Sequence, residues 1–182
     1  MSPSFKCFAV SVAASVVCGF ATLSQAATPI TVTSQSATDG PIKYTVKITS
    51  KQFGNAQETR QIRSGESDDY TWKTVPPGGP VPTSDDCPNN TSLALDANGA
   101  AIRQMQVRLA PVVASDGTAT VQLSFQGQTP HGTKMVTANG KSIKCPNDVS
   151  LSQIVRFTMP TNGTAKTLTL SDGTQVVVSA RR

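Results

Sequence analysis

Apolar and polar residues alternate along most of the chain, and turns containing glycine interrupt the alternation. The clearest run covers residues 42–49, where Ile42, Tyr44, Val46 and Ile48 alternate with two lysines and two threonines. A strand with one buried and one solvated face has this period of two, whereas an amphipathic helix repeats its apolar residues every three or four positions. The pattern therefore predicts an all-β protein.

Eleven runs of this kind occur, and we expect about nine or ten short strands from them because one or two runs do not form separate strands. The runs lie near 30–36, 42–50, 57–63, 69–75, 102–110, 118–126, 133–138, 141–146, 151–159, 165–171 and 174–180. Short strands at this spacing indicate an antiparallel β-sandwich, Ig-like or related. Two sheets packed face to face would bury apolar faces that a single sheet would leave exposed.

The turns also predict which residues lie opposite each other in hairpins, because the correct loop length places apolar residues on a common face. We expect two-residue loops at Asn139-Gly140 and Asn162-Gly163, and three-residue loops at Asp116-Gly117 and Asp172-Gly173. Pro111 has no N–H and marks a sheet edge or a bulge. The expected pairs are Val136–Ile143, Lys134–Cys145, Phe157–Leu168, Val155–Leu170, Leu109–Leu123, Val107–Phe125, Leu170–Val176 and Leu168–Val178.

Residues 1–26 follow the plan of a cleaved secretory signal peptide. Lys6 gives a basic start, residues 7–23 are mostly apolar or small, and residues 24–26 fit a signal peptidase site. The apolar run is short for a membrane span, which needs about 20 residues. We therefore expect a secreted or periplasmic protein, with one domain at 27–182 and no transmembrane segment.

Charge and composition exclude one class of partner. Residues 1–26 contain one basic and no acidic residue, so cleavage would change the net charge from +5 to +4. This excess is too small, and aromatic residues are too few, for a nucleic-acid binder. Lys43, Lys47 and Lys51 share one face of an expected strand, where they could contact an anionic surface or simply protect a solvated face.

Two cysteines remain after the predicted cleavage, Cys87 and Cys145, because Cys7 and Cys18 lie in the signal peptide. A cysteine pair in an oxidising compartment most simply forms one disulfide. The alternatives are a zinc site and a nucleophilic thiol, but two cysteines without a second ligand pair make a poor zinc site. We expect a Cys87–Cys145 disulfide, no metal and no cofactor.

The longest irregular stretch is the loop at 76–90, which is rich in proline and glycine. Loops of this length in compact domains are usually functional or disordered, and Cys87 would tie this one to the core. It is either a displayed binding loop or a solvated crossover between the sheets. The candidate contact residues are Tyr70, Trp72, Pro80, Asp85 and Asp86. A calcium site at Asp85, Asp86, Asn89 and Asn90 is a further option, although turn chemistry explains these residues.

No residue pattern typical of an enzyme is found. His131 is the only histidine, it lies in a turn-like stretch, and no Gly-x-Ser-x-Gly motif accompanies it. Asp39, Asp116 and Asp172 each precede a glycine in an expected turn, which accounts for them without catalysis.

The leading hypothesis is therefore an exported, non-enzymatic β-sandwich that binds a protein or glycan partner at the cell envelope or outside the cell. One alternative is a secreted or periplasmic hydrolase acting on envelope polymers, which would use two spaced aspartates or His131. The other is a structural subunit of a surface assembly, which would present a long exposed edge strand. The sequence leaves the oligomeric state open.

Overall fold

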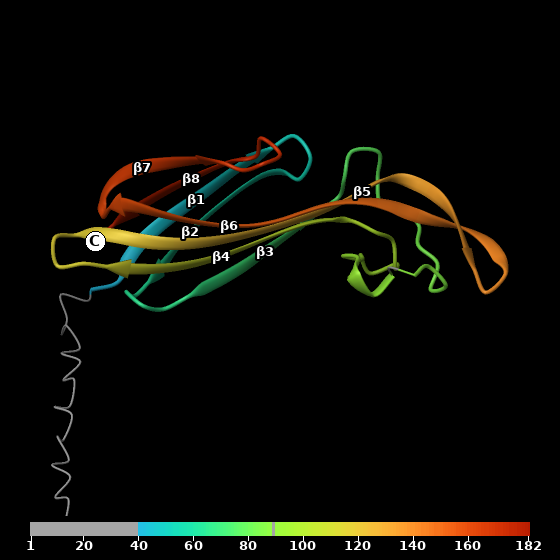
Figure 1. Cartoon of the computed structure of the whole chain (residues 1–182), viewed down its shortest axis with the longest axis horizontal. Coiled ribbons are helices and arrows are strands. Elements are labelled where there is room, and N and C mark those ends of the chain that lie inside the picture. Colours follow the sequence, from blue (N-terminus) through green and yellow to red (C-terminus); the bar gives the residue numbers. More distant parts are fainter. Residues whose placement is uncertain (1–39, 89) are drawn as a thin grey trace, which may run out of the picture. The chain divides into compact units, whose positions relative to one another are not determined.

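The computed structural model describes residues 40–88 and 90–182 (Figure 1). The predicted signal peptide and the strand near 30–36 lie outside these residues. The described chain contains eight strands and one 3-10 helix, η1 (Asn90–Ser92). The strands are β1 (Ile42–Ser50), β2 (Gly54–Ile62), β3 (Asp68–Thr74), β4 (Arg103–Val113), β5 (Thr118–Ala138), β6 (Lys141–Pro160), β7 (Asn162–Thr169) and β8 (Gln175–Arg181). In this part of the chain, no helix is long and apolar enough to cross a membrane.

The strands form two antiparallel four-stranded sheets in a sandwich-like arrangement. One sheet has the order β2-β1-β8-β7, and the other has the order β3-β4-β5-β6. The prediction of an all-β fold with one disulfide is confirmed, since Cys87 and Cys145 are bonded.

The apolar core lies between the two sheets, as the alternation predicts. In β1, Ile42, Tyr44, Val46 and Ile48 are buried, and the lysines between them are exposed. The facing sheet contributes alternate residues of β4 and β5, so a period of two in the sequence becomes one continuous core. The largest contributors from that sheet are Met105, Val107, Leu109, Val121, Leu123 and Phe125.

The expected count of nine or ten strands is wrong for the described residues, because four expected strands merge into two. Residues 118–126 and 133–138 belong to the single strand β5, and residues 141–146 and 151–159 belong to β6. The turn-like stretch between the two halves of β5 is a bulge, marked by a register shift between Pro130 and Thr133. A bulge lets the ladder continue past residues that cannot pair regularly.

Two of the four hairpin registers are confirmed. Val136 lies opposite Ile143 and Lys134 opposite Cys145 across the Asn139-Gly140 turn. Across the Asp116-Gly117 turn, the expected Leu109–Leu123 and Val107–Phe125 pairs are both present. Pro111 pairs with Val121 beyond the start of β3, where β4 has no strand on its other side.

The register at Asp172 is shifted by two residues from the prediction. Leu168 pairs with Val176 instead of Val178, and the three-residue loop is 171–173. The side chain of Asp172 braces this loop: its Oδ1 accepts the Thr174 N–H at 2.9 Å, and its Oδ2 lies 2.6 Å from Thr174 Oγ1. Thr174 is thereby held as the residue that closes the loop.

The expected hairpin at Asn162-Gly163 is wrong, because β6 and β7 lie in different sheets. The chain changes sheet at Thr161, which is buried and hydrogen-bonded to Gly117 and Arg182. Its N–H and its hydroxyl donate to the Gly117 carbonyl at 3.0 and 2.8 Å, and its carbonyl accepts the Arg182 N–H at 3.1 Å. Phe157 and Leu168 consequently are not strand partners.

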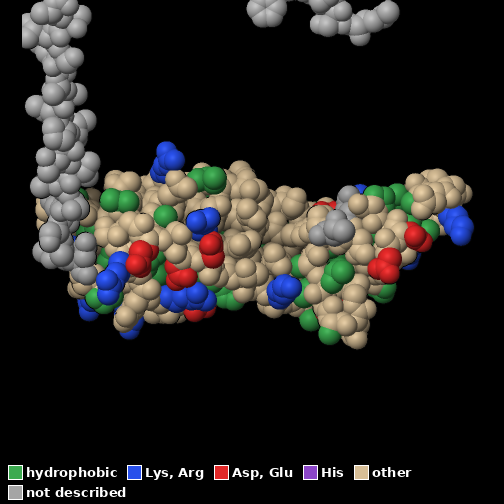
Figure 2. Space-filling model, turned by 90° about the horizontal axis from the view of Figure 1, so that it is seen from below, with side chains coloured by type: hydrophobic (Ala, Val, Ile, Leu, Met, Phe, Trp, Pro, Cys, Tyr) green, Lys and Arg blue, Asp and Glu red, His purple; other side chains and the backbone are tan. Residues whose placement is uncertain are grey.

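Charged side chains of both signs lie intermingled on the face shown in Figure 2. The described chain also contains ion pairs, such as Arg60 with Glu58 at 3.3 Å and with Asp68 at 3.2 Å. Arg108 Nε lies 3.8 Å from Asp69 Oδ1 on the exposed face of the other sheet. A surface with this mixture of charges has no broad basic patch on that face.

Candidate functional site

A distal arm extends from the sandwich. We use this name for residues 75–102 together with residues 129–150, the far ends of β5 and β6. Figure 1 shows β5 and β6 continuing past the other strands, with the green segment between β3 and β4 beside them. The core cluster of the sandwich contains no residue of the arm. The arm is therefore not needed to fill the core.

The disulfide lies in the arm and not in the sandwich core. It joins Cys87 of the long loop to Cys145 of β6, and both residues are buried. The loop is held a second time by Ala101, which forms isolated bridges with Val81 and Leu95 and is fully buried. The predicted loop at 76–90 is thus part of a larger, cross-linked structure.

The arm has an apolar pocket and exposed apolar side chains. The pocket measures about 160 Å³ and lies beside the disulfide. It is lined by Cys87, Pro88, Leu93, Lys134, Val136, Cys145 and Pro146. Met135 and Val75 are 63% and 61% exposed, which is high for large apolar side chains.

The structure does not bring the five predicted contact residues together. Tyr70 is 4% exposed and packs in the sandwich core, where its ring meets that of half-buried Trp72 at 4.8 Å in a T-shaped arrangement. Pro80, Asp85 and Asp86 lie on the arm and are exposed. Tyr70 is thus inaccessible to a partner, whereas the three arm residues are accessible.

Both acidic residues of the predicted loop take part in local hydrogen bonds. Asp85 Oδ1 accepts the Asn90 amide at 3.2 Å, and the Asp86 N–H donates to Ser84 Oγ at 3.3 Å. Among the described residues, no group of three or more His, Cys, Asp or Glu side chains is placed to hold a metal ion.

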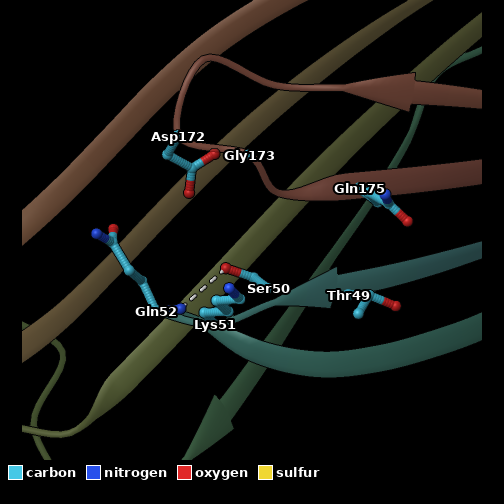
Figure 3. Close-up of a pocket in the computed structure, with 7 residues that line it drawn as sticks. All are labelled: Thr49, Ser50, Lys51, Gln52, Asp172, Gly173 and Gln175. Atoms are coloured by element: carbon cyan, nitrogen blue, oxygen red, sulfur yellow. Dashed lines mark hydrogen bonds between the residues drawn. The ribbon is translucent and has the colours of Figure 1, made fainter.

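Two more pockets flank the turn between β1 and β2, where the sandwich meets the arm. Both are lined by Lys51 and Gln52. The first measures about 300 Å³, and Figure 3 shows Gln52 and Asp172 facing it from two different turns. Ser50 Oγ accepts the Gln52 and Phe53 N–H groups at 3.3 and 3.1 Å.

Two buried hydroxyl groups, which form a hydrogen bond, join the two turns beside this first pocket. Ser50 Oγ lies 2.8 Å from Thr174 Oγ1, which lies 2.6 Å from Asp172 Oδ2. A carboxylate only accepts, so Thr174 donates to Asp172 and Ser50 donates to Thr174. The β1–β2 turn and the β7–β8 turn are thereby joined through side chains.

The second pocket is basic and measures about 420 Å³. It is lined by Lys51, Gln52, Pro77, Arg103, Thr129, Pro130, His131 and Val149. Arg103 is 9% exposed, and its Nε is buried without a hydrogen-bond partner. Burial lowers the pKa of the Arg103 guanidinium from its ordinary value. Sequence reasoning missed this residue, although Arg103 occupies the same face of β4 as Met105 and Val107.

Comparison with known proteins identifies a family for this chain. The sequence matches a family described as a family of unknown function, DUF6013, over residues 1–182. The chain belongs to DUF6013. Neither a curated protein nor a solved structure matches it. The function of this DUF6013 protein must therefore be argued from its own geometry.

Proposed function

We propose that this DUF6013 protein is an exported, non-enzymatic binding protein whose distal arm docks a protein partner at the cell envelope or outside the cell. The observation that carries the proposal is the position of the disulfide. Cys87 and Cys145 brace a structure that contributes nothing to the sandwich core. A rigid surface loses less conformational entropy when it binds, which favours affinity.

The chemistry of the arm favours a protein over other partners. Its pocket is lined mainly by apolar side chains such as Leu93 and Val136. Met135 lies between two pocket residues of β5 and therefore points to the opposite face of the strand, where it is 63% exposed. Exposed apolar side chains are typical of protein interfaces, and methionine is enriched there. Exposed Asp85 and Asp86 supply a polar margin.

Export is the second part of the proposal. The predicted signal peptide supports it, and so does the buried disulfide, because such bonds persist in oxidising compartments. Mass spectrometry of the protein isolated from its native host tests this part. We expect cleavage after Ala26 and a mass about two units below that of the reduced chain. A chain that keeps Lys6 and has free thiols at Cys87 and Cys145 would contradict export.

Site-specific photocrosslinking tests the arm. Met135 on the arm and Ile154 on the sandwich are both 63% exposed, so they form a matched pair. A photoreactive residue at position 135 is expected to capture a discrete partner in native envelope preparations, and one at position 154 is not. Equal capture from positions 135 and 154 would argue against the arm as the docking surface.

A further inference from the structure

We infer that the pocket around Arg103 is a binding site for a small sugar that carries a carboxylate or a phosphate. This site lies at the base of the arm and is independent of the partner surface proposed above. Its lining includes three basic side chains, Lys51, Arg103 and His131, and no carboxylate among the described residues. The pocket therefore presents hydrogen-bond donors and positive charge to whatever enters it.

Arg103 is the residue on which the inference depends. Its side chain is nine-tenths buried, its Nε has no partner, and none of the described carboxylates pairs with it. A buried polar atom without a partner is costly, so proteins normally satisfy such groups. An oxyanion in the pocket would supply the missing partner, because a guanidinium binds carboxylate or phosphate through two parallel hydrogen bonds.

The backbone is shaped to admit this guanidinium. Gly54 has φ +90°, and a Cβ added there would come within 2.5 Å of Arg103 Nη1. The arginine head therefore lies directly against the backbone of the β1–β2 turn. On the other side, Thr129 is its neighbour across the ladder, since Gln104 pairs with Gln128. The closeness of the Arg103 head to the Gly54 backbone places it at the pocket.

The rest of the lining suits a sugar more than a bare ion. A pocket of about 420 Å³ falls within the range of small-molecule sites, which measure roughly 300–1,000 Å³. Gln52 and Thr129 offer an amide and a hydroxyl that can bond sugar hydroxyl groups. Pro77, Pro130 and Val149 give apolar walls for the ring carbons.

The pocket gathers Lys51, Arg103 and His131 from three separate segments of the chain. Lys47 provides the internal comparison, because it lies exposed on β1 close to Lys51 in sequence and is not part of the pocket lining.

Calorimetric titration of the oxidised protein tests the site. The probes are glucuronate, glucose 6-phosphate, glucose and inorganic phosphate. We expect at least one of the two charged sugars to bind about 10-fold more tightly than glucose and inorganic phosphate, because both the charge and the ring contribute. Failure of both charged sugars to bind at millimolar concentration would overturn the inference. Equal binding of inorganic phosphate would overturn the assignment to a sugar.

Variants separate ligand binding from a structural role. Arg103→Met is expected to weaken charged-sugar binding about 30-fold, and Lys51→Gln about 3-fold, since the lysine is exposed. The matched control Lys47→Gln should bind like the wild type. The ligand-free Arg103→Met protein should melt at the same temperature as the wild type or higher, because it loses a buried N–H group without a partner.

The opposite pattern would identify Arg103 as a structural residue. In that case Arg103→Met would melt at a clearly lower temperature without ligand, and Lys51→Gln would bind the charged sugars as tightly as Lys47→Gln does. Because these titrations do not involve Met135 or Val75, their failure would leave the proposed docking surface of the arm intact.

Discussion

The rings of Tyr44 and Tyr70 lie 6.5 Å apart between the two sheets, but only one of their hydroxyl groups has a partner. The Tyr44 hydroxyl donates to Asp68 Oδ2 at 2.6 Å, whereas the Tyr70 hydroxyl is buried without a hydrogen bond. Arg60 lies over the Tyr70 ring at 5.2 Å and also contacts Asp68. The hydroxyl groups of these two tyrosines are therefore expected to have opposite effects on stability.

Replacing each tyrosine by phenylalanine should reveal that difference. Tyr44→Phe removes a hydrogen bond to a carboxylate and is expected to lower the unfolding free energy by about 2 kcal/mol. Tyr70→Phe removes an unsatisfied buried hydroxyl and is expected to raise it by about 1 kcal/mol. Urea denaturation of the two variants beside the wild type measures both changes. A loss of stability in Tyr70→Phe would show that its hydroxyl has a favourable partner.

The same cluster predicts loss of stability at alkaline pH. Burial, and then the hydrogen bond to Asp68, raise the pKa of Tyr44 above its ordinary value of 10.0. Burial, and then the neighbouring Tyr44 and Asp68, raise the pKa of Tyr70 in the same direction. The unfolded chain thus releases these protons at lower pH than the folded chain, so their contribution is complete below pH 10 and falls above it.

Denaturation between pH 7 and 11 measures this effect. Above pH 10 each tyrosine should contribute a slope of up to about 1.4 kcal/mol per pH unit. The chain has only these two tyrosines, so ultraviolet absorbance of tyrosinate reports on them alone. Lysines also titrate in this range, and the difference between the wild type and Tyr44→Phe removes their contribution. Parallel curves for the two proteins would contradict the prediction.

Gly127 is required because Phe53 lies directly on it. A Cβ at position 127 would come within 2.8 Å of the Phe53 ring, which is fully buried and packs 5.8 Å from the Phe125 ring. Gly127→Ala is therefore expected to lower the unfolding free energy by about 2 kcal/mol, the usual cost of overpacking. Thermal denaturation measures the change.

Two further variants control the Gly127 experiment. Gly40→Ala meets no atom within 4 Å and should leave stability almost unchanged. Phe53→Leu introduced together with Gly127→Ala should cost less than the two single changes combined, because the smaller side chain relieves the clash. Additive losses of unfolding free energy would mean that a Cβ at position 127 does not clash with Phe53.

Removing the disulfide should loosen the arm and spare the sandwich. The bond closes a loop with a sequence separation of 58, for which chain entropy sets an upper limit of about 4 kcal/mol. In a Cys87→Ser/Cys145→Ser protein, we expect amide hydrogen exchange at 133–146 to accelerate at least about 10-fold while β1 and β8 keep their protection. Equal loss of protection in β1 and β8 would show that the arm and the sandwich unfold as one unit.

The sequence predicted those parts of the fold that depend on local pattern. The alternation in β1, the turn at Asn139-Gly140 and the cysteine pair each carry their own signal, and each is confirmed. The pairing of β6 with β7 failed because Thr161 forms a corner through contacts with Gly117 and Arg182, which are distant in sequence. Local periodicity cannot show such contacts.

The candidate sites were less accessible to prediction than the fold. Pro80, Asp85 and Asp86 were correctly assigned to an irregular loop, but its continuation to residue 102 was not predicted. Arg103 carried a usable signal, since a charged residue at an inward position of a strand requires an explanation. Its proximity to Lys51 and His131 depends on the meeting of three separate segments, which the sequence alone does not show.

The affinity of the arm for its captured partner tests the central claim most directly. The dissociation constant should be measured for the wild type, Met135→Ser on the arm and Ile154→Ser on the sandwich. Met135→Ser is expected to weaken binding at least about 10-fold, because it removes an apolar anchor from the interface. Ile154→Ser is expected to leave the dissociation constant unchanged. Equal affinities of the two variants, or a loss confined to Ile154→Ser, would contradict a docking role for the arm.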